Sequence, residues 1–97
     1  MTRTAVLATL KALEQELRAK GVGALHLYGS VGRNEAQAGS DVDLFFDRAP
    51  GARIGLALVA MKHAIEDALG APVDFGSREG LHPMLRADIE ASSIQVF

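Results

Sequence analysis

The spacing of apolar residues divides the chain into alternating helical and extended segments. In two long stretches apolar residues recur every three or four positions, which is typical of helices with one buried face. In shorter stretches they alternate with polar residues, as expected of strands that bury one face of a sheet. The predicted order is helix, strand, strand, helix, strand, short helix and strand, over 4–20, 24–28, 41–46, 53–69, 71–75, 83–91 and 93–97. This order predicts an α/β fold in which helices pack on a small β-sheet.

Glycines and an apolar stripe characterise the two long helices. Gly21 and Gly70 follow the last periodic residues, where a left-handed helix cap is expected. The second helix would bury a stripe of five apolar residues, which are Ile54, Leu58, Met61, Ile65 and Leu69. Leu56 and Val59 widen this stripe. The widening indicates either a protein partner or self-association, or else additional packing in the core.

Length and composition favour one globular domain, residues 1–97, with a single small core. The chain has 97 residues, and 48% of them are hydrophobic, a share typical of globular proteins. A second, substrate-binding domain would need a longer chain. No apolar run has the length of a membrane-spanning helix, and the amphipathic N-terminal segment carries acids, unlike a signal peptide. We therefore expect no membrane partner and a cytoplasmic location.

Charge and cysteine content narrow the possible ligands. The formal net charge is −2, and the ten lysines and arginines are scattered along the chain. Proteins that grip nucleic acid through its phosphates usually carry a basic stripe, so we expect no direct nucleic-acid binding. A single nucleotide remains compatible with this charge. The chain has no cysteine, which excludes disulfides and thiolate metal sites and agrees with the cytosol.

The stretch 27–47 carries the strongest candidate chemistry. Asp41 and Asp43 lie two apart on a predicted strand, so their side chains share a face with Cα atoms about 6.5 Å apart. Together they can hold Mg²⁺, which prefers oxygen ligands and takes the remaining ones from water and substrate phosphates. The preceding turn, Gly29 and Ser30, offers backbone N–H groups and a hydroxyl to phosphate oxygens. Phosphoryl transfer needs this pairing, with two ions roughly 3.5–4 Å apart flanking the attacked phosphorus.

Each of these residues also has a purely structural interpretation. Gly29 could serve an ordinary tight turn, Ser30 could be a helix N-cap, and the aspartates could form a solvent-facing acidic edge. Arg33 lies on the same side as Ser30 if a helical turn follows. Its guanidinium either meets a phosphate, braces the loop or is a solvated surface charge. Because acids follow a Gly-Ser turn at this spacing, we favour the functional interpretation.

Asp74 is the candidate for a third carboxylate. It lies on the predicted strand 71–75, between Val73 and Phe75, which would face the core. If this strand lies beside the strand 41–46, Asp74 reaches the same pocket. The structural alternative is an ion pair at the strand edge, with Arg78 or Arg86 as the partner.

Several other polar residues are expected to have structural roles. His26 is interpreted as a half-buried strand histidine with a local hydrogen bond, and Tyr28 as packing near the turn. Asp47, at a strand end, is interpreted as a member of a surface ion pair. His63 is expected on the surface of the second long helix. The C-terminal tail shows no catalytic pattern, although His82 could approach a partner.

The signature from Gly29 to Leu44, G-S-x-x-R-N-x-x-x-x-x-S-D-x-D-L, resembles that of the polymerase-β-type nucleotidyltransferase superfamily. More narrowly, the chain resembles the minimal nucleotidyltransferases, or MNT proteins, which are commonly the antitoxin partners of HEPN-domain toxins. The likeness extends over nearly the whole chain, including Val73–Phe75 and the segment 77–86. It implies a polymerase-β-like fold with a small mixed sheet.

This resemblance implies Mg²⁺-dependent transfer of AMP from ATP to a tyrosine hydroxyl of a HEPN-type toxin, with which the chain would form a complex. It implies that three carboxylates hold two Mg²⁺ ions and act in catalysis: Asp41, Asp43 and Asp74. Asp74 would also accept the proton of the attacking hydroxyl. The nucleotide would be bound by four further residues, which are Gly29, Ser30, Arg33 and Ser40.

Two other functions stay open at this point. The chain could be a non-catalytic antitoxin that neutralises its partner by binding and masking it. It could also transfer a nucleotide to a small molecule such as an aminoglycoside, which would need an additional substrate-binding domain. The presence of all three acids together with the Gly-Ser pair favours an active enzyme over a masking protein.

Overall fold

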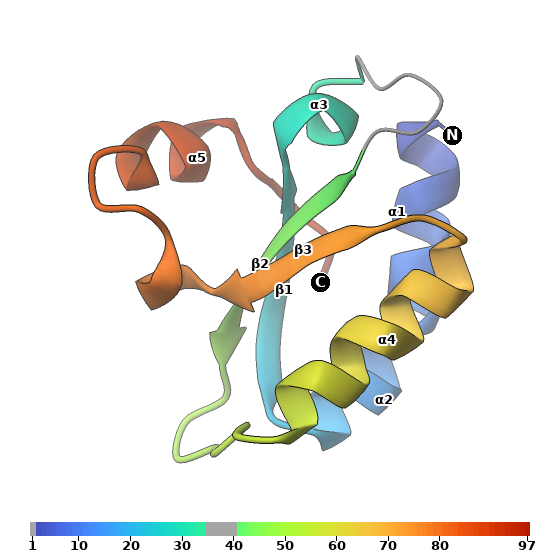
Figure 1. Ribbon diagram of the computed structural model, residues 1–97, viewed down its shortest axis with the longest axis vertical. Helices are drawn as coiled ribbons and strands as arrows, with labels where there is room; N and C mark the ends of the chain where they lie inside the picture. Colours follow the sequence, from blue (N-terminus) through green and yellow to red (C-terminus); the bar gives the residue numbers. More distant parts are fainter. Residues whose placement is uncertain (1, 35–40) are drawn as a thin grey trace.

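The computed structural model describes residues 2–34 and 41–97 as a mixed β-sheet with helices on both faces (Figure 1). In chain order the described elements are α1 (Arg3–Ala12), α2 (Glu14–Ala19), β1 (Val22–Tyr28), α3 (Gly29–Gly32), β2 (Val42–Arg48), α4 (Ala57–Leu69), β3 (Val73–Ser77), the 3₁₀ helix η1 (Arg78–Gly80), α5 (Arg86–Ser92) and β4 (Ile94–Gln95).

The sheet has the strand order β3-β2-β1-β4. Strand β1 is antiparallel to both of its neighbours, β2 and β4, whereas β2 and β3 are parallel. The chain passes from β2 to β3 through α4, because a parallel pair needs a long crossover connection. The predicted α/β fold, a small mixed sheet packed with helices, is therefore confirmed.

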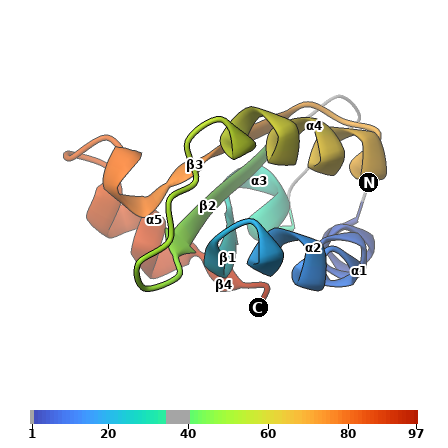
Figure 2. The same ribbon diagram turned by 90° about the horizontal axis from the view of Figure 1, so that it is seen from below.

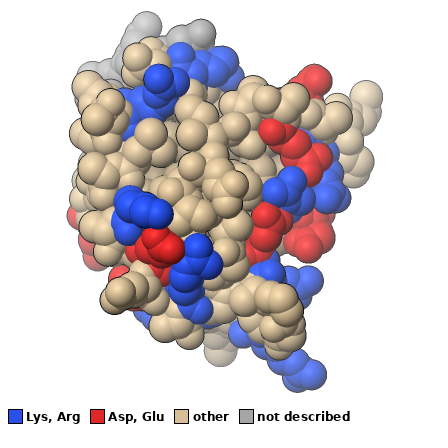
Figure 3. Space-filling model, turned by 180° about the vertical axis from the view of Figure 1, so that it is seen from behind, with Lys and Arg blue, Asp and Glu red and all other residues tan. Residues whose placement is uncertain are grey.

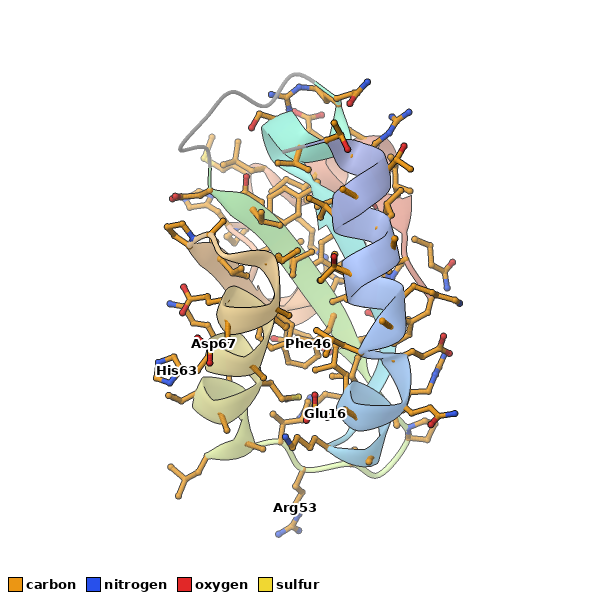
Figure 4. All side chains as sticks on the ribbon, turned by 90° about the vertical axis from the view of Figure 1, so that its right-hand side faces the viewer. Glu16, Phe46, Arg53, His63 and Asp67 are labelled. Atoms are coloured by element: carbon orange, nitrogen blue, oxygen red, sulfur yellow. The ribbon has the colours of Figure 1, made fainter. Side chains whose placement is uncertain are left out.

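The main core lies on the face of the sheet that α1, α2 and α4 cover (Figures 1 and 2). Every second strand residue points into it, and these are Leu25, Leu27, Val42, Leu44, Phe46, Val73 and Phe75. Figure 4 shows Phe46 between α4 and the α1–α2 pair, with His63 and Asp67 on the outer side of α4. The exposed position of His63 confirms its interpretation as a surface residue.

The opposite face of the sheet is covered by η1 and α5, on the left in Figure 1. Helix α5 has no buried residue. Apolar burial therefore contributes little to its attachment, and polar contacts take a larger share. These contacts matter for the site because the same face carries the carboxylates.

Two predicted helices begin or break differently from expectation. The single helix predicted over 4–20 is two helices, because the Leu13 N–H bonds to the nearer Leu10 carbonyl and tightens the chain between α1 and α2. The helix predicted to start at Arg53 starts at Ala57. Gly55 has φ +49°, a left-handed conformation that interrupts a right-handed helix. The predicted cap at Gly70 is confirmed, with φ +68°.

The strand limits shift by one or two residues, and the start of the last helix shifts by three. Asp41 precedes β2, which extends to Arg48 instead of ending at Phe46. Strand β3 starts at Val73, after Pro72, which has no N–H to offer a ladder. The last strand is confined to Ile94–Gln95, although Phe97 still accepts a hydrogen bond from the Leu25 N–H at 3.1 Å. The last helix, predicted over 83–91, is Arg86–Ser92.

The surface carries separate apolar residues and mixed charge. Leu56 is 93% exposed and Val59 56% exposed, so the interpretation of these two as core residues is wrong. Figure 3 shows Lys and Arg beside Asp and Glu on the back of the molecule, around an uncharged centre. Among the described residues no helix is long and apolar enough to cross a membrane.

Candidate active site

Tyr28, Asp43 and Asp74 form one row across three neighbouring strands. Tyr28 pairs with Asp43 between β1 and β2, and Asp43 pairs with Asp74 between β2 and β3. Directly paired residues share a face, and adjacent strands lie about 4.8 Å apart. The sheet register therefore brings Asp43 and Asp74 to neighbouring positions on the face that α5 covers.

The structural alternative for Asp74 was an ion pair with Arg78 or Arg86, and each of these arginines pairs with another acid. Arg78 pairs with Asp47, with Nε 2.7 Å from Oδ1, and also with Glu90. The Arg86 Nε lies 3.6 Å from a Glu90 carboxylate oxygen. Both arginines thus have acidic partners other than Asp74, which leaves Asp74 on the row with Asp43.

Gly29 begins α3 immediately after Tyr28 and lies against Asp43. Its φ of +73° favours glycine, and a Cβ at this position would lie 2.1 Å from Asp43 Oδ2. The sequence predicts that this turn offers backbone N–H groups to phosphate oxygens. The structure shows that the Asp43 carboxylate occupies the space that a side chain at Gly29 would need, so glycine allows the turn and the acid to touch.

The charges around Asp43 oppose its ionisation. Burial raises the pKa of the Asp43 carboxyl, and the negative charges of Asp74 and Asp41 raise it further, while the Arg33 guanidinium counteracts them. Like charges held this close destabilise the ionised forms unless a cation lies nearby. The Arg33 guanidinium supplies part of that positive charge. The backbone N–H of Arg33 also donates a hydrogen bond to the Gly29 carbonyl at 3.0 Å.

Tyr28 stands in the same electrostatic environment. Burial raises the pKa of its hydroxyl to about 12, and the carboxylates of Asp74 and Asp43 contribute to the rise. Its ring also packs on Phe45, with centroids 5.8 Å apart, as the packing interpretation predicted. Tyr28 is therefore a neutral hydroxyl at neutral pH that lines the acidic row.

The carboxylates of the row supply only part of the ligand shell that a divalent cation needs. Among the described residues no three His, Cys, Asp or Glu side chains are grouped closely enough to hold a metal ion. Asp43 and Asp74 are adjacent, whereas Asp41 is exposed just before β2. Mg²⁺ commonly uses one or two protein carboxylates and completes its shell with water and substrate phosphates. The donor set on the row fits that pattern.

A pocket of about 350 Å³ opens beside the row, under the C-terminal segment. Its lining comes from β1–β3 and from the tail, and consists of Tyr28, Asp43, Leu44, Asp74, Gly76, Ser77, Gly80, Leu81, His82, Leu85 and Ile89. Sequence reasoning missed most of these residues. Gly76 could have been found, since it follows Asp74 at the spacing of two that places side chains on one face. The tail residues carried no such signal.

Arg78 joins the tail to the sheet, and its role was also missed. Its Nη2 lies 2.9 Å from Asp47 Oδ2 and 3.3 Å from His26 Nε2, and its guanidinium lies over the Phe45 ring at 4.9 Å. Nη1 bonds to Glu90 on α5. The predicted ion pair of Asp47 exists, with Arg78 as its partner, and His26 contacts the same carboxylate. His26 is structural as predicted, but it is buried instead of half-buried, and its hydrogen bond is to Asp47 on the neighbouring strand instead of a local group. Its ring also stacks on Phe45.

The remaining predicted nucleotide ligands have different positions. Ser30 lies in the short helix α3, one residue after Gly29. Ser40 lies outside the described residues. The tight turn that joins β1 to α3 brings Gly29 against Asp43 and the charge of Arg33 near it.

Adjacent carboxylates beside a glycine turn are an arrangement that suits phosphoryl chemistry on nucleotides. A family model described as "Nucleotidyltransferase domain" matches residues 10–96. The chain therefore belongs to the nucleotidyltransferase domain family.

Individual relatives agree with this assignment. The chain is 33% identical over 76 residues to a Methanocaldococcus jannaschii protein named "Putative protein adenylyltransferase", covering 78% of this chain and 81% of the relative. A solved structure described as "Structure of putative minimal nucleotidyltransferase" has a TM-score of 0.81 and 32% identity, covering 97% of this chain and 95% of that one.

A more distant solved structure is described as "Crystal structure of the toxin-antitoxin with AMP-PNP". It has a TM-score of 0.72 and 19% identity, and the match covers 92% of this chain and 72% of that one. At this level of identity the likeness shows the fold alone. The chain thus shares its fold with the protein in that structure.

Proposed function

We propose that this chain is a protein adenylyltransferase that transfers AMP from ATP to a tyrosine hydroxyl of a HEPN-type toxin and thereby silences it. The observation that carries the proposal is the row of Asp43 and Asp74 against Gly29. The relative named as a protein adenylyltransferase supports a protein acceptor. The toxin–antitoxin structure with AMP-PNP supports an adenine nucleotide and a toxin partner.

In this proposal each residue has a defined task. Asp43 and Asp74 would hold two Mg²⁺ ions together with the substrate phosphates, and Asp41, just before β2, would join them once the ions and phosphates are bound. The ions would supply neutralisation of charge on the phosphates. Gly29 and Ser30 direct N–H groups and a hydroxyl toward the β- and γ-phosphates, and Arg33 and Ser40 complete the nucleotide contacts. Residues 1–97 act as a single domain, in a cytoplasmic complex with the toxin.

The transfer is a displacement at the α-phosphorus. The tyrosine oxygen forms a bond to this phosphorus while the bond to the bridging oxygen of pyrophosphate breaks. The hydroxyl proton passes to the Asp74 carboxylate, and pyrophosphate leaves toward Gly29 and Ser30. Asp74 suits this role because it is exposed at the pocket and lies next to Asp43.

The test is the mass of the partner. The chain is purified with the protein that associates with it, incubated with ATP and Mg²⁺, and the partner is weighed by intact mass spectrometry. The expected result is a gain of one or more AMP groups, located on tyrosine by fragmentation. An unmodified partner that is still inhibited by the Asp43→Asn variant would instead identify the chain as a masking antitoxin.

Asp43→Asn should abolish transfer without weakening the fold. We expect activity to fall by at least about 100-fold, the loss typical for removal of one well-placed electrostatic group. The melting temperature should stay level or rise, because a carboxyl whose pKa is raised by folding costs stability at neutral pH. Asp67→Asn, on the outer side of α4, makes the same chemical change away from the site and is the control.

A further inference from the structure

Among the described residues, the pocket extends from the acidic row toward the C-terminal end of β3. Along β3 it runs from Asp74 to Ser77, about 10 Å by strand rise. Because β1 is antiparallel to β2, this direction leads away from Gly29, which follows Tyr28 at the other end. The Gly-Ser turn and the pocket thus lie on opposite sides of the carboxylates.

The geometry of phosphoryl transfer assigns a reactant to each side. The attacking and leaving oxygens lie roughly in line through the phosphorus. If pyrophosphate leaves toward Gly29 and Ser30, the attacking hydroxyl arrives from the side of the pocket. The pocket therefore faces the acceptor, and the triphosphate faces the turn.

The walls of the pocket select the kind of acceptor. Leu81, Leu85 and Ile89 give it an apolar outer wall, and Gly76 leaves its floor as bare backbone. A Cβ added at Gly76 would meet no heavy atom within 4 Å, so this space belongs to the pocket. A volume of about 350 Å³ lies near the lower end of ligand pockets, which suits one side chain.

We propose that this acceptor slot, lined by Gly76, Leu81, Leu85 and Ile89, seats the ring of the acceptor tyrosine with its hydroxyl at Asp74. Gly76 is then the position that determines specificity. A flat aromatic ring lies on it, whereas the small side chain of an acceptor serine would leave the slot unfilled. The inference rests on the proposed function, because the attacking group is defined by the transfer of AMP.

The experiment measures binding, so it does not depend on transfer. The chain is loaded with Mg²⁺ and α,β-methylene-ATP, and N-acetyl-tyrosinamide is titrated while backbone amide signals are followed by NMR. N-acetyl-serinamide is the comparison probe. The expected result is saturable shifts at Gly76, Ser77 and Leu81 with the tyrosine probe only.

The decisive variant is Gly76→Leu, which fills the slot without meeting another atom at its Cβ. It should weaken binding of the tyrosine probe by about tenfold or more, equivalent to ~1.4 kcal/mol, while the affinity for α,β-methylene-ATP stays within about twofold. Ala68→Leu adds an apolar side chain at an exposed position on α4 and should change neither affinity.

Three results would overturn the inference. The first is the absence of saturable binding of the tyrosine probe to the parent chain. The second is binding of this probe to Gly76→Leu with the same affinity as to the parent chain. The third is a Gly76→Leu variant that loses binding of α,β-methylene-ATP but keeps binding of the tyrosine probe. The last would place the nucleotide base in the slot. Probe binding without any adenylylated partner would count against the proposed function and leave the slot intact.

Discussion

At the scale of single residues, the site depends on a contact that only one amino acid allows. Gly29 combines a positive φ with a Cβ direction that points at Asp43 Oδ2. Because it has no side chain, Gly29 lets the turn and the Asp43 carboxylate lie in contact before any ligand binds. Gly51 has nearly the same φ, +75°, but open space around it. A comparison of Gly29 with Gly51 therefore separates the cost of the left-handed backbone from the cost of the steric contact with Asp43.

Gly29→Ala should destabilise the chain more than Gly51→Ala. Both substitutions carry the left-handed backbone cost of about 1–2 kcal/mol. At Gly29 the methyl group must also displace the Asp43 carboxylate, which should add at least about 1 kcal/mol. Urea unfolding of the two variants measures the difference. Equal losses would show that Asp43 moves aside freely and that the contact does not restrain the site.

The hydroxyl of Tyr28 should report the charge of the row. Tyr28 is the only tyrosine in the chain, so tyrosinate absorbance follows this group alone. Its pKa should be about 12, and it should fall toward the ordinary value of about 10 in Asp43→Asn and Asp74→Asn. Because folding raises this pKa, the contribution of Tyr28 to stability should be constant below about pH 10 and should be lost as the pH rises toward 12. A titration at the ordinary pKa in the parent chain would contradict this placement of Tyr28.

At the scale of elements, helix α5 depends on Arg78. The helix buries no residue, whereas Arg78 connects Glu90 on α5 with Asp47 and His26 on the sheet and covers Phe45. Hydrogen bonds from the Arg78 guanidinium lower the pKa of both Asp47 and Glu90. The outer wall of the acceptor slot is thus joined to the sheet by these ionic contacts.

Arg78→Met should loosen α5 and leave the main core intact. We expect faster hydrogen exchange at the amides of 86–92, with little change in β1 and β2. Because folding lowers the pKa of Asp47 and Glu90, the network stabilises the parent chain above the unfolded values of about 4 and this contribution is lost as the pH falls through the lower folded values. The variant should therefore show a smaller loss of stability in acid.

Arg48→Met is the matched control for this prediction. Arg48 and Glu79 form an exposed pair at 3.9 Å that does not reach α5. Its removal should leave hydrogen exchange in α5 unchanged. Equal protection of α5 in the Arg78 and Arg48 variants would show that the helix is held by other contacts.

At the scale of the whole molecule, the sheet separates stability from chemistry. One face carries the apolar core under α1, α2 and α4, and the other carries the acidic row, the Arg78 network and the pocket. Alternation along each strand produces this separation, since neighbouring residues point to opposite faces. Leu44 and Phe46 face the core, whereas Asp43 and Asp47 do not.

Substitutions on the core face should affect stability, and exposed apolar residues should not. Ile65 is fully buried on α4, so Ile65→Ala should cost about 2–5 kcal/mol. Leu56 precedes the same helix and is 93% exposed, so Leu56→Ala should remain within about 0.5 kcal/mol. Thermal or urea unfolding tests both. A large loss in Leu56→Ala would mean that the residue is covered in solution, for example by a second chain.

The sequence predicted the elements more accurately than their ends. Helix α4 and the strands followed from apolar periodicity, but the start of α4 depended on the left-handed conformation of Gly55, and the break at Leu13 on a local hydrogen bond. The prediction that Asp74 lies beside Asp43 was conditional on strand order. Periodicity gives the face of a residue and not the neighbour of its strand.

The sequence by itself determined the family signature from Gly29 to Leu44, the amphipathic helices, and the alternation that gives Asp43 and Asp74 their face. Only the tertiary structure decided that β3 lies beside β2 in a register that aligns the two acids, and that Arg78 fastens the tail over them. The physical reason is distance along the chain. Local patterns arise from neighbours a few residues apart, whereas the slot joins residues that only the folded sheet brings into contact.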